Sequence, residues 1–370
     1  MKIAMLGCGY VANMYRLTMG LHPGLELAGV YDRERSRAEN MAKLTGAKAY
    51  ADPGALLADD TVPLVLNLTN PAAHAETTRA LLEAGKHVYT EKPIALGLAD
   101  TIALADLAKQ RGLMLCSAPC TALNPVARTL AEAVRDQSVG PIRLVYAEMD
   151  DGMVARAPHA KWVNEAGTAW PAMDEFRTGC TLEHAGYVLS WLCALFGPAE
   201  RVTAFSDVLM PEKIAGRPPF ETPDFSVACV RFRSGVTARL TNGIYAAHDH
   251  RMRLFGDEGV LTVDDPRSDN SPVRLRRYHT IRRRRFLSPI STRLRPSREA
   301  RGVPRYRGSQ VRDFCRAIAD MALAIEQGRP PTLATDFGVH VNEITLACQS
   351  GGDQQLQTSF EAMEVPSWAA

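Results

Sequence analysis

The sequence lacks several features that would set a 370-residue chain apart from ordinary globular proteins. No apolar run approaches the roughly 20 residues that a transmembrane helix needs. The first residues pass directly into an apolar run typical of a core strand, so we expect no signal peptide. The chain also has no internal repeat and no low-complexity linker. At this length, two domains are favoured over one.

Cysteine patterns typical of metal sites are also missing. The eight cysteines include no CxxC pair, and no two Cys or His residues have ligand spacing on a convincing turn. Several cysteines have apolar neighbours, as Cys116 does after Leu115. We therefore expect no metal centre, and we interpret the cysteines as reduced core thiols of a cytoplasmic protein.

The most specific pattern lies in the first 32 residues. Two apolar runs, residues 2–6 and 25–31, are typical of buried strands, and Gly7-Cys8-Gly9-Tyr10-Val11-Ala12 follows the first of them. Such a GxGxxA turn between a strand and a helix brings backbone N–H groups close to a pyrophosphate. Asp32, at the end of the second strand, can accept hydrogen bonds from a ribose. The pattern predicts a bound dinucleotide.

The residue after Asp32 leaves the choice of dinucleotide open. Asp32 suits the ribose hydroxyls of NAD. Arg33 could accept the 2′-phosphate of NADP, or it could be a solvated side chain after a strand. Both NAD and NADP remain possible cofactors.

Strands alternate with helices as far as residue 116, which predicts a parallel, doubly wound sheet. The predicted strands are residues 2–6, 25–31, 47–50, 64–68, 87–90 and 113–116, and helices between them end near residues 21, 45, 84 and 111. Ligands of such sheets bind at the carboxyl ends of the strands. The fingerprint, Asp32, Thr69-Asn70-Pro71 and Glu91-Lys92-Pro93 all fall there, so we expect them to line one crevice.

The pattern changes after about residue 121. Predicted strands at residues 142–148, 201–208, 225–232, 237–241, 252–255 and 259–263 are joined in part by short turns, which is typical of an antiparallel sheet. Further helices are predicted at residues 125–136, 180–196, 309–326 and 336–350. We predict an α/β Rossmann dinucleotide-binding domain (1–121) followed by an α+β domain (122–370) with a mostly antiparallel open sheet. The late helices are expected to pack back on the first domain.

Four motifs, in this order, resemble the Gfo/Idh/MocA oxidoreductases: the GxGxxA turn, Thr69-Asn70-Pro71 with His74, Glu91-Lys92-Pro93, and a Gly-rich helix start before an antiparallel sheet. The resemblance covers most of the chain and weakens from about residue 266 to 305. It implies an NAD(P)-dependent dehydrogenase of a sugar, an inositol or a nucleotide-linked sugar. By resemblance, Lys92 is the catalytic lysine, and Pro93, often after a cis peptide, shapes the turn beneath the nicotinamide.

The chemistry of Lys92 can also be argued from the residue itself. Hydride transfer between an alcohol carbon and nicotinamide needs a group that takes or gives the hydroxyl proton. A lysine, with an ordinary pKa of about 10.4, suits this task only if burial or nearby positive charge lowers its pKa. The nicotinamide pocket could supply both. The alternative is a surface lysine after a strand.

The helix at residues 180–196 departs from the family, which usually has an Asp and a His four residues apart. Here Glu183 and Tyr187 take these places, on one helix face. Tyr187 could donate or accept a proton, or be a half-buried aromatic. Glu183 could orient a sugar hydroxyl. His184, on a different face, is a rival to Glu183.

Other candidates come from expected substrate loops. Asn124 and Lys161 are candidate substrate contacts, and the stretch from Trp162 to Trp170 is expected near the pocket, where its aromatics either stack on a sugar or pack the domain interface. His74 is expected to support the crevice. The predicted cofactor residues are Gly7, Gly9, Tyr10, Val11, Ala12, Asp32, Arg33, Thr69, Asn70, Pro71, His74, Glu91, Lys92 and Pro93. The predicted substrate residues are Lys92, Asn124, Lys161, Glu183, His184 and Tyr187, with Lys92, Tyr187 and Glu183 catalytic.

Three functions fit these observations. The leading hypothesis is hydride transfer between NAD(P) and a hydroxyl or keto carbon of a sugar or nucleotide-linked sugar. A redox-neutral enzyme with tightly bound NAD, and a non-catalytic sensor of the cofactor, are the alternatives. The exposed face of the second sheet also suggests a homo-oligomer, a dimer or a tetramer, as in the family that the chain resembles.

Charge of one sign is concentrated in a single stretch. The net charge is only +2, yet thirteen arginines and one acid lie between Arg274 and Arg307. Three interpretations are open: a solvated insertion, a clamp for the diphosphate of a nucleotide-linked sugar, or contact with an anionic membrane surface or an acidic partner. Aromatic residues are sparse there, so nucleic acid is not expected.

Overall fold

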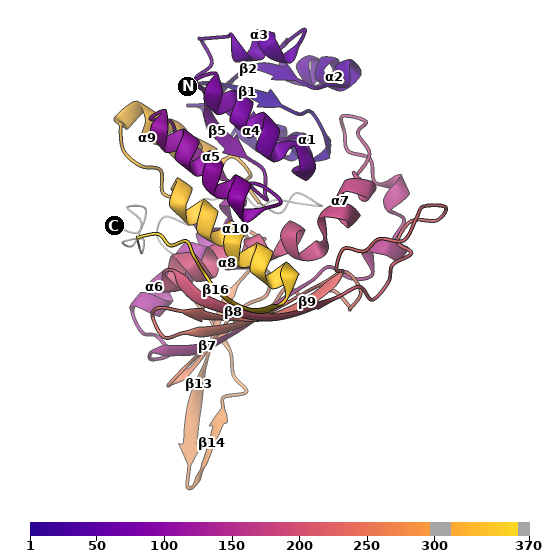
Figure 1. Cartoon of the computed structure of the whole chain (residues 1–370). Helices are drawn as coiled ribbons and strands as arrows, with labels where there is room; N and C mark the ends of the chain where they lie inside the picture. The colour runs from indigo at the N-terminus through magenta and orange to yellow at the C-terminus, as the bar shows by residue number, and fades with distance from the viewer. Residues whose placement is uncertain (297–311, 362–370) are drawn as a thin grey trace.

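The computed structural model describes residues 1–296 and 312–361, which form two sheets with helices around and between them (Figure 1). The first sheet is parallel, and its strands lie in the order β3-β2-β1-β4-β5-β6. They are β1 (Lys2–Leu6), β2 (Glu26–Tyr31), β3 (Lys48–Ala49), β4 (Leu64–Asn67), β5 (His87–Thr90) and β6 (Leu115–Ser117). This confirms the predicted Rossmann domain. The strand order reverses between β1 and β4, which opens a crevice at their carboxyl ends.

Capping residues mark two of the helix ends in this domain. Its helices are α1 (Tyr10–Met19), α2 (Arg35–Thr45), α3 (Pro53–Leu57), α4 (His74–Glu83) and α5 (Leu98–Gln110). Gly46 ends α2 in the left-handed conformation, with φ of 75°. Asp52 caps α3 by accepting a hydrogen bond from the N–H of Ala55 at 2.8 Å. The helix expected to end near residue 84 starts at His74, because the residues before it form a 3-10 turn, η1 (Pro71–Ala73).

The second sheet has ten strands in the order β14-β13-β12-β11-β7-β10-β9-β8-β16, with β15 paired to β13. It is mostly antiparallel, as predicted, but β7 and β10 run parallel. The strands are β7 (Ile142–Asp150), β8 (Ala199–Asp207), β9 (Phe225–Phe232), β10 (Thr237–Gly243), β11 (Met252–Gly256), β12 (Gly259–Val263), β13 (Val273–Ile281), β14 (Arg284–Leu287), β15 (Thr292–Arg293) and β16 (Gly352–Gln355).

The last four strands were not predicted, because most of their residues are polar and exposed. Only the first part of β13 has buried apolar residues, Val273 and Leu275. Its outer part pairs with β14 in a hairpin that projects from the sheet, away from the first domain (Figure 1). The hairpin carries much of the basic stretch, including Arg282 to Arg285, whereas Arg298, Arg301, Arg305 and Arg307 lie outside the described residues.

Helices cover one face of the second sheet, between it and the first domain (Figure 1). They include α6 (Pro125–Arg135), α8 (Cys180–Phe196) and α10 (Thr335–Ser350), while α7 (Ala172–Thr178) lies beside α8. Trp191 of α8 is fully buried beneath the sheet. The other face exposes Phe205, at 58 %, and Cys229. The interpretation of the cysteines as core thiols is therefore wrong for Cys229 and confirmed for the other seven, which are buried.

The late helices connect the two domains. The amide of Asn342, on α10, accepts a hydrogen bond from the N–H of Ile94 at 3.0 Å and donates to Thr101 Oγ1 at 3.0 Å. The helix α9 (Arg316–Gln327) starts later than the predicted residue 309. Residues 312–315 are not helical, because they contact both domains through other bonds, and residues 309–311 lie outside the described part.

Membrane-spanning helices are absent from residues 1–296 and 312–361, where no helix combines the required length and apolar character.

The bonds of Asn342 predict that this residue stabilises the docking of α10. Replacing Asn342 by Ala leaves the N–H of Ile94 buried without this acceptor, so we expect the free energy of unfolding to fall by about 2 kcal/mol. Denaturant titration measures this change. Asn40→Ala, at an exposed position of α2, is the matched control and should cost under about 0.5 kcal/mol. Equal losses in the two variants would contradict this account.

Candidate active site

A cleft of about 660 Å³ lies between the first domain and helices α7 and α8. A second cavity of about 420 Å³ continues it beneath the ends of β1 and β2, and the two share Gly9, Thr69 and Asn70. Of the predicted residues, the cleft is lined by Gly9, Tyr10, Val11, Arg33, Thr69, Asn70, Pro71, His74, Glu91, Lys92, Glu183, His184 and Tyr187. Gly7 and Asp32 line the second cavity. The motifs at the carboxyl ends of the parallel strands therefore line one continuous crevice, as expected.

Two glycines shape the turn after β1 in different ways. Gly7 has φ of 100°, and a Cβ there would lie 2.5 Å from the carbonyl oxygen of Leu68, so this position requires glycine. At Gly9 a Cβ would meet no atom within 4 Å and would project into the open cleft. Gly9 is also the N-cap of α1, and no side chain caps that helix. Free N–H groups beside open space fit the pyrophosphate of a dinucleotide.

Asp32 is held rigidly at the far end of the crevice. Its two carboxylate oxygens accept hydrogen bonds from the N–H groups of Cys8, at 2.7 Å, and Glu34, at 2.8 Å. The carboxylate is thereby oriented toward the second cavity, where a ribose would be recognised. Arg33 and Arg37 line both cavities, so cations that could meet a 2′-phosphate are present as well.

His74 supports the crevice from below, as predicted. Its Nδ1 lies 2.6 Å from the carbonyl oxygen of Pro93 and its Nε2 2.9 Å from that of Thr69. Burial lowers the pKa of His74, despite the carbonyl groups on both sides. The ring is fully buried and ties two strand-end loops together, so its role is to position them. The Lys92–Pro93 peptide is cis.

Lys92 forms an ion pair with Glu183 of α8, across the boundary between the domains. The side chain of Lys92 is only 17 % exposed and that of Glu183 only 4 %. Burial acts to lower the pKa of Lys92, but the carboxylate of Glu183, followed by Tyr187 and other acids, outweighs it and raises the pKa. The condition for a lysine base, a lowered pKa, is therefore not met, because the carboxylate of Glu183 contacts the ammonium group, which the sequence did not show.

A second carboxyl group, which the sequence analysis missed, lies beside this pair. Glu175 of α7 lines the cleft together with Lys92 and Glu183. Burial, and then the neighbouring carboxylate of Glu183, raise the pKa of Glu175 well above its ordinary value. The raised pKa favours the protonated, neutral form of Glu175 next to the Lys92–Glu183 pair.

Tyr187 follows Glu183 by one helical turn and lines the same cleft, as its spacing predicted. Its phenolic oxygen accepts a hydrogen bond from Nη2 of Arg312 at 3.0 Å. The ammonium group of Lys92 lies 6.0 Å from the ring centroid. A tyrosine hydroxyl at the wall of a cleft can exchange a proton with a bound substrate.

Comparisons with known proteins agree with this geometry. Residues 1–118 match the model of the oxidoreductase family with an NAD-binding Rossmann fold, and residues 127–262 match the GFO/IDH/MocA C-terminal domain. The chain belongs to the Gfo/Idh/MocA family. It is therefore an NAD(P)-binding oxidoreductase of that family, and the predicted resemblance is confirmed.

Individual relatives of the Gfo/Idh/MocA family differ in what they act on. Myo-inositol 2-dehydrogenase of Thermotoga maritima is 25 % identical over 98 % of this chain and 99 % of its own. A dTDP-3,4-didehydro-2,6-dideoxy-α-D-glucose 3-reductase of Streptomyces violaceoruber is 27 % identical over 72 % of this chain and 75 % of its own. Among solved structures, KijD10, a 3-ketoreductase of Actinomadura kijaniata in complex with NADP and TDP-benzene, has a TM-score of 0.73 at 21 % identity, covering 95 % of this chain and 97 % of its own.

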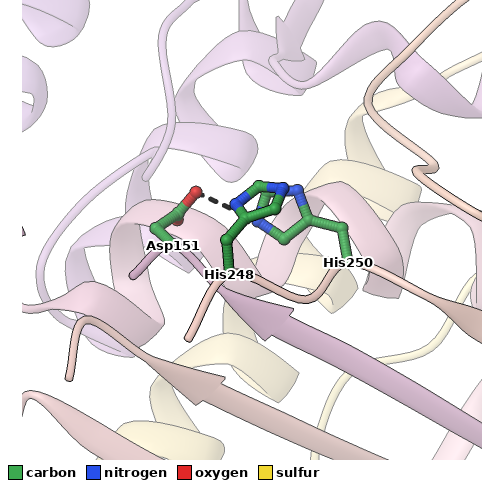
Figure 2. Close-up of side chains that lie close together, drawn as sticks. All are labelled: Asp151, His248 and His250. Carbon is green, nitrogen blue, oxygen red and sulfur yellow. Dashed lines mark ion pairs between the residues drawn. The ribbon is translucent and has the colours of Figure 1, made fainter. Parts of the chain in front are cut away.

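His184 belongs to a second polar network that also lines the cleft, with Asp151 and Arg267, rather than to the Lys92 cluster. Its Nδ1 lies 2.9 Å from Asp151, which also pairs with His250 at 3.0 Å and with Arg267 at 2.9 Å. Asp151, His248 and His250 are close enough to resemble a metal-ligand set among the described residues (Figure 2). However, the guanidinium of Arg267 contacts both Asp151 and His250, so the charge of the carboxylate is already balanced.

Two predicted substrate residues do not line the cleft. The amide of Asn124 caps α6 by accepting a hydrogen bond from the N–H of Ala127 at 2.7 Å, and it is buried. Lys161 is exposed. The loop that includes Trp162 and Trp170 does lie at the cleft, and the two rings pack against each other with centroids 5.2 Å apart.

No described residue of the basic stretch that begins at Arg274 lines the cleft. None of the arginines from Arg274 to Arg295 lines either cavity, and the hairpin projects in the opposite direction (Figure 1). Several of them contact their own sheet instead, as Arg274 does with Asp264 and Arg276 does with the carbonyl oxygen of Ser288. For the described residues, this disagrees with the diphosphate clamp.

The two glycines predict different outcomes on substitution. Gly9→Ala should weaken the binding of NADH and NADPH at least about tenfold while the melting temperature of the cofactor-free protein stays unchanged, because the new methyl group enters open space where a pyrophosphate would lie. Gly7→Ala should lower that melting temperature as well, since its Cβ would clash with Leu68. Fluorescence titration and thermal unfolding measure the two effects. Unchanged cofactor binding in Gly9→Ala would contradict the placement of the pyrophosphate.

Proposed function

We propose that the protein transfers a hydride between NAD(P) and a hydroxyl or keto carbon of a sugar or nucleotide-linked sugar. The observation that carries this proposal is the Lys92–Glu183 ion pair, with Tyr187 one turn along α8, in a cleft continuous with the dinucleotide cavity. The relatives named above, which act on an inositol and a nucleotide-linked ketosugar, support the substrate class.

The cofactor would be held by the N-terminus of α1, by Asp32, and by the loops at Thr69 and Glu91. When bound, NAD(P) supplies the hydride acceptor or donor. Gly9 leaves the space that the pyrophosphate needs, and no Cβ fills it. The cavities and their donors thus fit this cofactor.

Lys92 would act as a cation rather than as a base. Because its pKa is raised, the ammonium group keeps its proton at neutral pH and can donate a hydrogen bond to a substrate oxygen. In the reduction of a ketone, negative charge develops on that oxygen, and a fixed ammonium group stabilises it. Glu183 holds the ammonium group in place and can accept a bond from a neighbouring sugar hydroxyl.

Tyr187 would then carry the proton. In the direction of reduction its hydroxyl protonates the substrate oxygen, and in oxidation the phenolate takes the proton back. Burial and the neighbouring Glu183 raise the pKa of Glu175, which favours its neutral form and limits the negative charge next to Lys92. The roles of all four side chains are part of the proposal.

We also propose that the protein forms a homo-oligomer through the uncovered face of the second sheet, which exposes Phe205. The free cysteines favour a reducing compartment such as the cytoplasm. Size-exclusion chromatography with light scattering measures the oligomeric state.

The function is tested by titrating the purified protein with NADH and NADPH, and by screening myo-inositol, UDP-N-acetylglucosamine and a dTDP-linked ketosugar for turnover. We expect tight binding of at least one cofactor and a net change in NAD(P)H absorbance with at least one of these compounds. Product formed without any net change would favour the redox-neutral alternative. Binding without turnover of any compound would favour the sensor.

Replacing Lys92 by Met should lower kcat by roughly a hundred- to a thousandfold, because the charge that stabilises the developing alkoxide is lost. Cofactor affinity should change far less. Lys109→Met, at an exposed position of α5, is the matched control and should retain full activity. Full activity in Lys92→Met would rule out the proposed role.

A further inference from the structure

Tyr187 stands among three cations, and one of them reaches its hydroxyl. The guanidinium of Arg312 lies 4.4 Å from the ring centroid and donates to the phenolic oxygen at 3.0 Å. Arg267 and Lys92 lie at 5.9 and 6.0 Å from the same centroid. On its own helix Tyr187 also faces Glu183, which is paired with Lys92.

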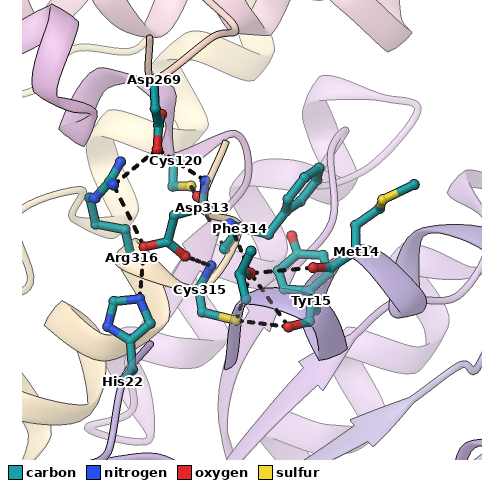
Figure 3. A network of polar contacts seen from close by, with 10 residues as sticks. Met14, Tyr15, His22, Cys120, Asp269, Asp313, Phe314, Cys315 and Arg316 are labelled. Carbon is teal, nitrogen blue, oxygen red and sulfur yellow. Dashed lines mark hydrogen bonds and ion pairs between the residues drawn. The ribbon is translucent and has the colours of Figure 1, made fainter. Parts of the chain in front are cut away.

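The segment that carries Arg312 is anchored to both domains (Figure 3). The N–H of Asp313 donates to Asp269, in the second domain, at 3.1 Å, and its carboxylate pairs with His22, after α1, at 2.8 Å. Arg316 contacts Asp269 at 3.1 Å and Asp313 at 3.6 Å. This buried network fixes the backbone immediately beside Arg312.

A line of packed rings connects the same segment to the loop of the catalytic lysine. Arg312 lies 4.6 Å over the ring of Phe314, which packs edge-on against Tyr15 with centroids 5.4 Å apart. The hydroxyl of Tyr15 donates to Glu91, the first residue of the Glu-Lys-Pro turn, at 2.5 Å. The guanidinium and the turn are thus positioned by one set of contacts.

We propose that Arg312 is a positioning residue, which holds the Tyr187 hydroxyl toward the cleft and stabilises the phenolate that remains after this hydroxyl protonates the substrate oxygen. The inference rests on the proposed function. The O–H bond of Tyr187 breaks and an O–H bond forms on the reduced substrate oxygen. The negative charge stays on the phenolate until a solvent proton replaces the one transferred. A charge-assisted hydrogen bond is strongest to that phenolate, so Arg312 favours the proton transfer more than it favours substrate binding.

The test is a double-mutant cycle between Arg312→Met and Tyr187→Phe, with a compound that the wild-type protein turns over. We expect Arg312→Met to lower kcat by about ten- to a hundredfold, with KM within about threefold. In the Tyr187→Phe background the same change should cost no more than about twofold, because the phenolate no longer forms. Arg312→Lys should recover part of kcat, since it restores the charge.

Controls separate this role from a structural one. Arg316, close to Arg312 in the chain, pairs with Asp269 and Asp313 and not with Tyr187. We therefore expect Arg316→Met and Tyr187→Phe to act independently, so that the fold-losses of kcat in the two single variants multiply in the double variant. The denaturation midpoints of the cofactor-free proteins provide a second readout: those of Arg312→Met and Tyr187→Phe should be non-additive. The inference would be overturned if the fold-losses of kcat in Arg312→Met and Tyr187→Phe multiplied in the double variant, or if Arg312→Met raised KM alone. Either result would leave the proposed function intact. No turnover by the wild-type protein would defeat both.

Discussion

The structure depends on one ion pair, between Lys92 at the end of β5 and Glu183 in the first turn of α8. It joins the end of β5, in the dinucleotide-binding domain, to α8 of the second domain. Both side chains line the cleft. Removing either partner would leave a buried charge uncompensated, which is costly. The pair also raises the pKa of Lys92, so that in the proposed mechanism the lysine acts as a fixed cation instead of a base.

Around this pair, charges of opposite sign are arranged so that each one is balanced by a neighbour. Glu175 lines the cleft beside Glu183, and burial and that neighbouring carboxylate raise its pKa. The hydroxyl of Tyr187 accepts a hydrogen bond from the guanidinium of Arg312. A second network in the same cleft pairs the Asp151 carboxylate with Arg267 and two histidines. In the proposed mechanism, the developing charge of a substrate oxygen would meet these fixed donors.

Much of this site could be predicted from the sequence, because local rules govern it. Parallel strand ends converge, so the fingerprint, Asp32 and the Glu-Lys-Pro turn had to share a crevice, and the period of α8 placed Glu183 and Tyr187 on one face. Contacts between distant segments were not predictable in this way. Arg312 and Glu175 reach the cleft only through tertiary packing, the pKa of Lys92 depends on the partner that folding supplies, and Asn124 was used as a helix cap instead of a ligand. The projecting hairpin was missed because most of its outer residues bury no apolar side chain.

The central claim is that hydride transfer occurs at the Lys92 end of the cleft. The most direct measurement follows a deuterium label from C4 of reduced cofactor into the product by mass spectrometry, with the wild-type protein and with Lys92→Met. The account predicts one deuterium on the product carbon that carries the new hydroxyl, at a rate that falls with the loss of Lys92. Unlabelled product, or labelled product formed equally fast without Lys92, would contradict it.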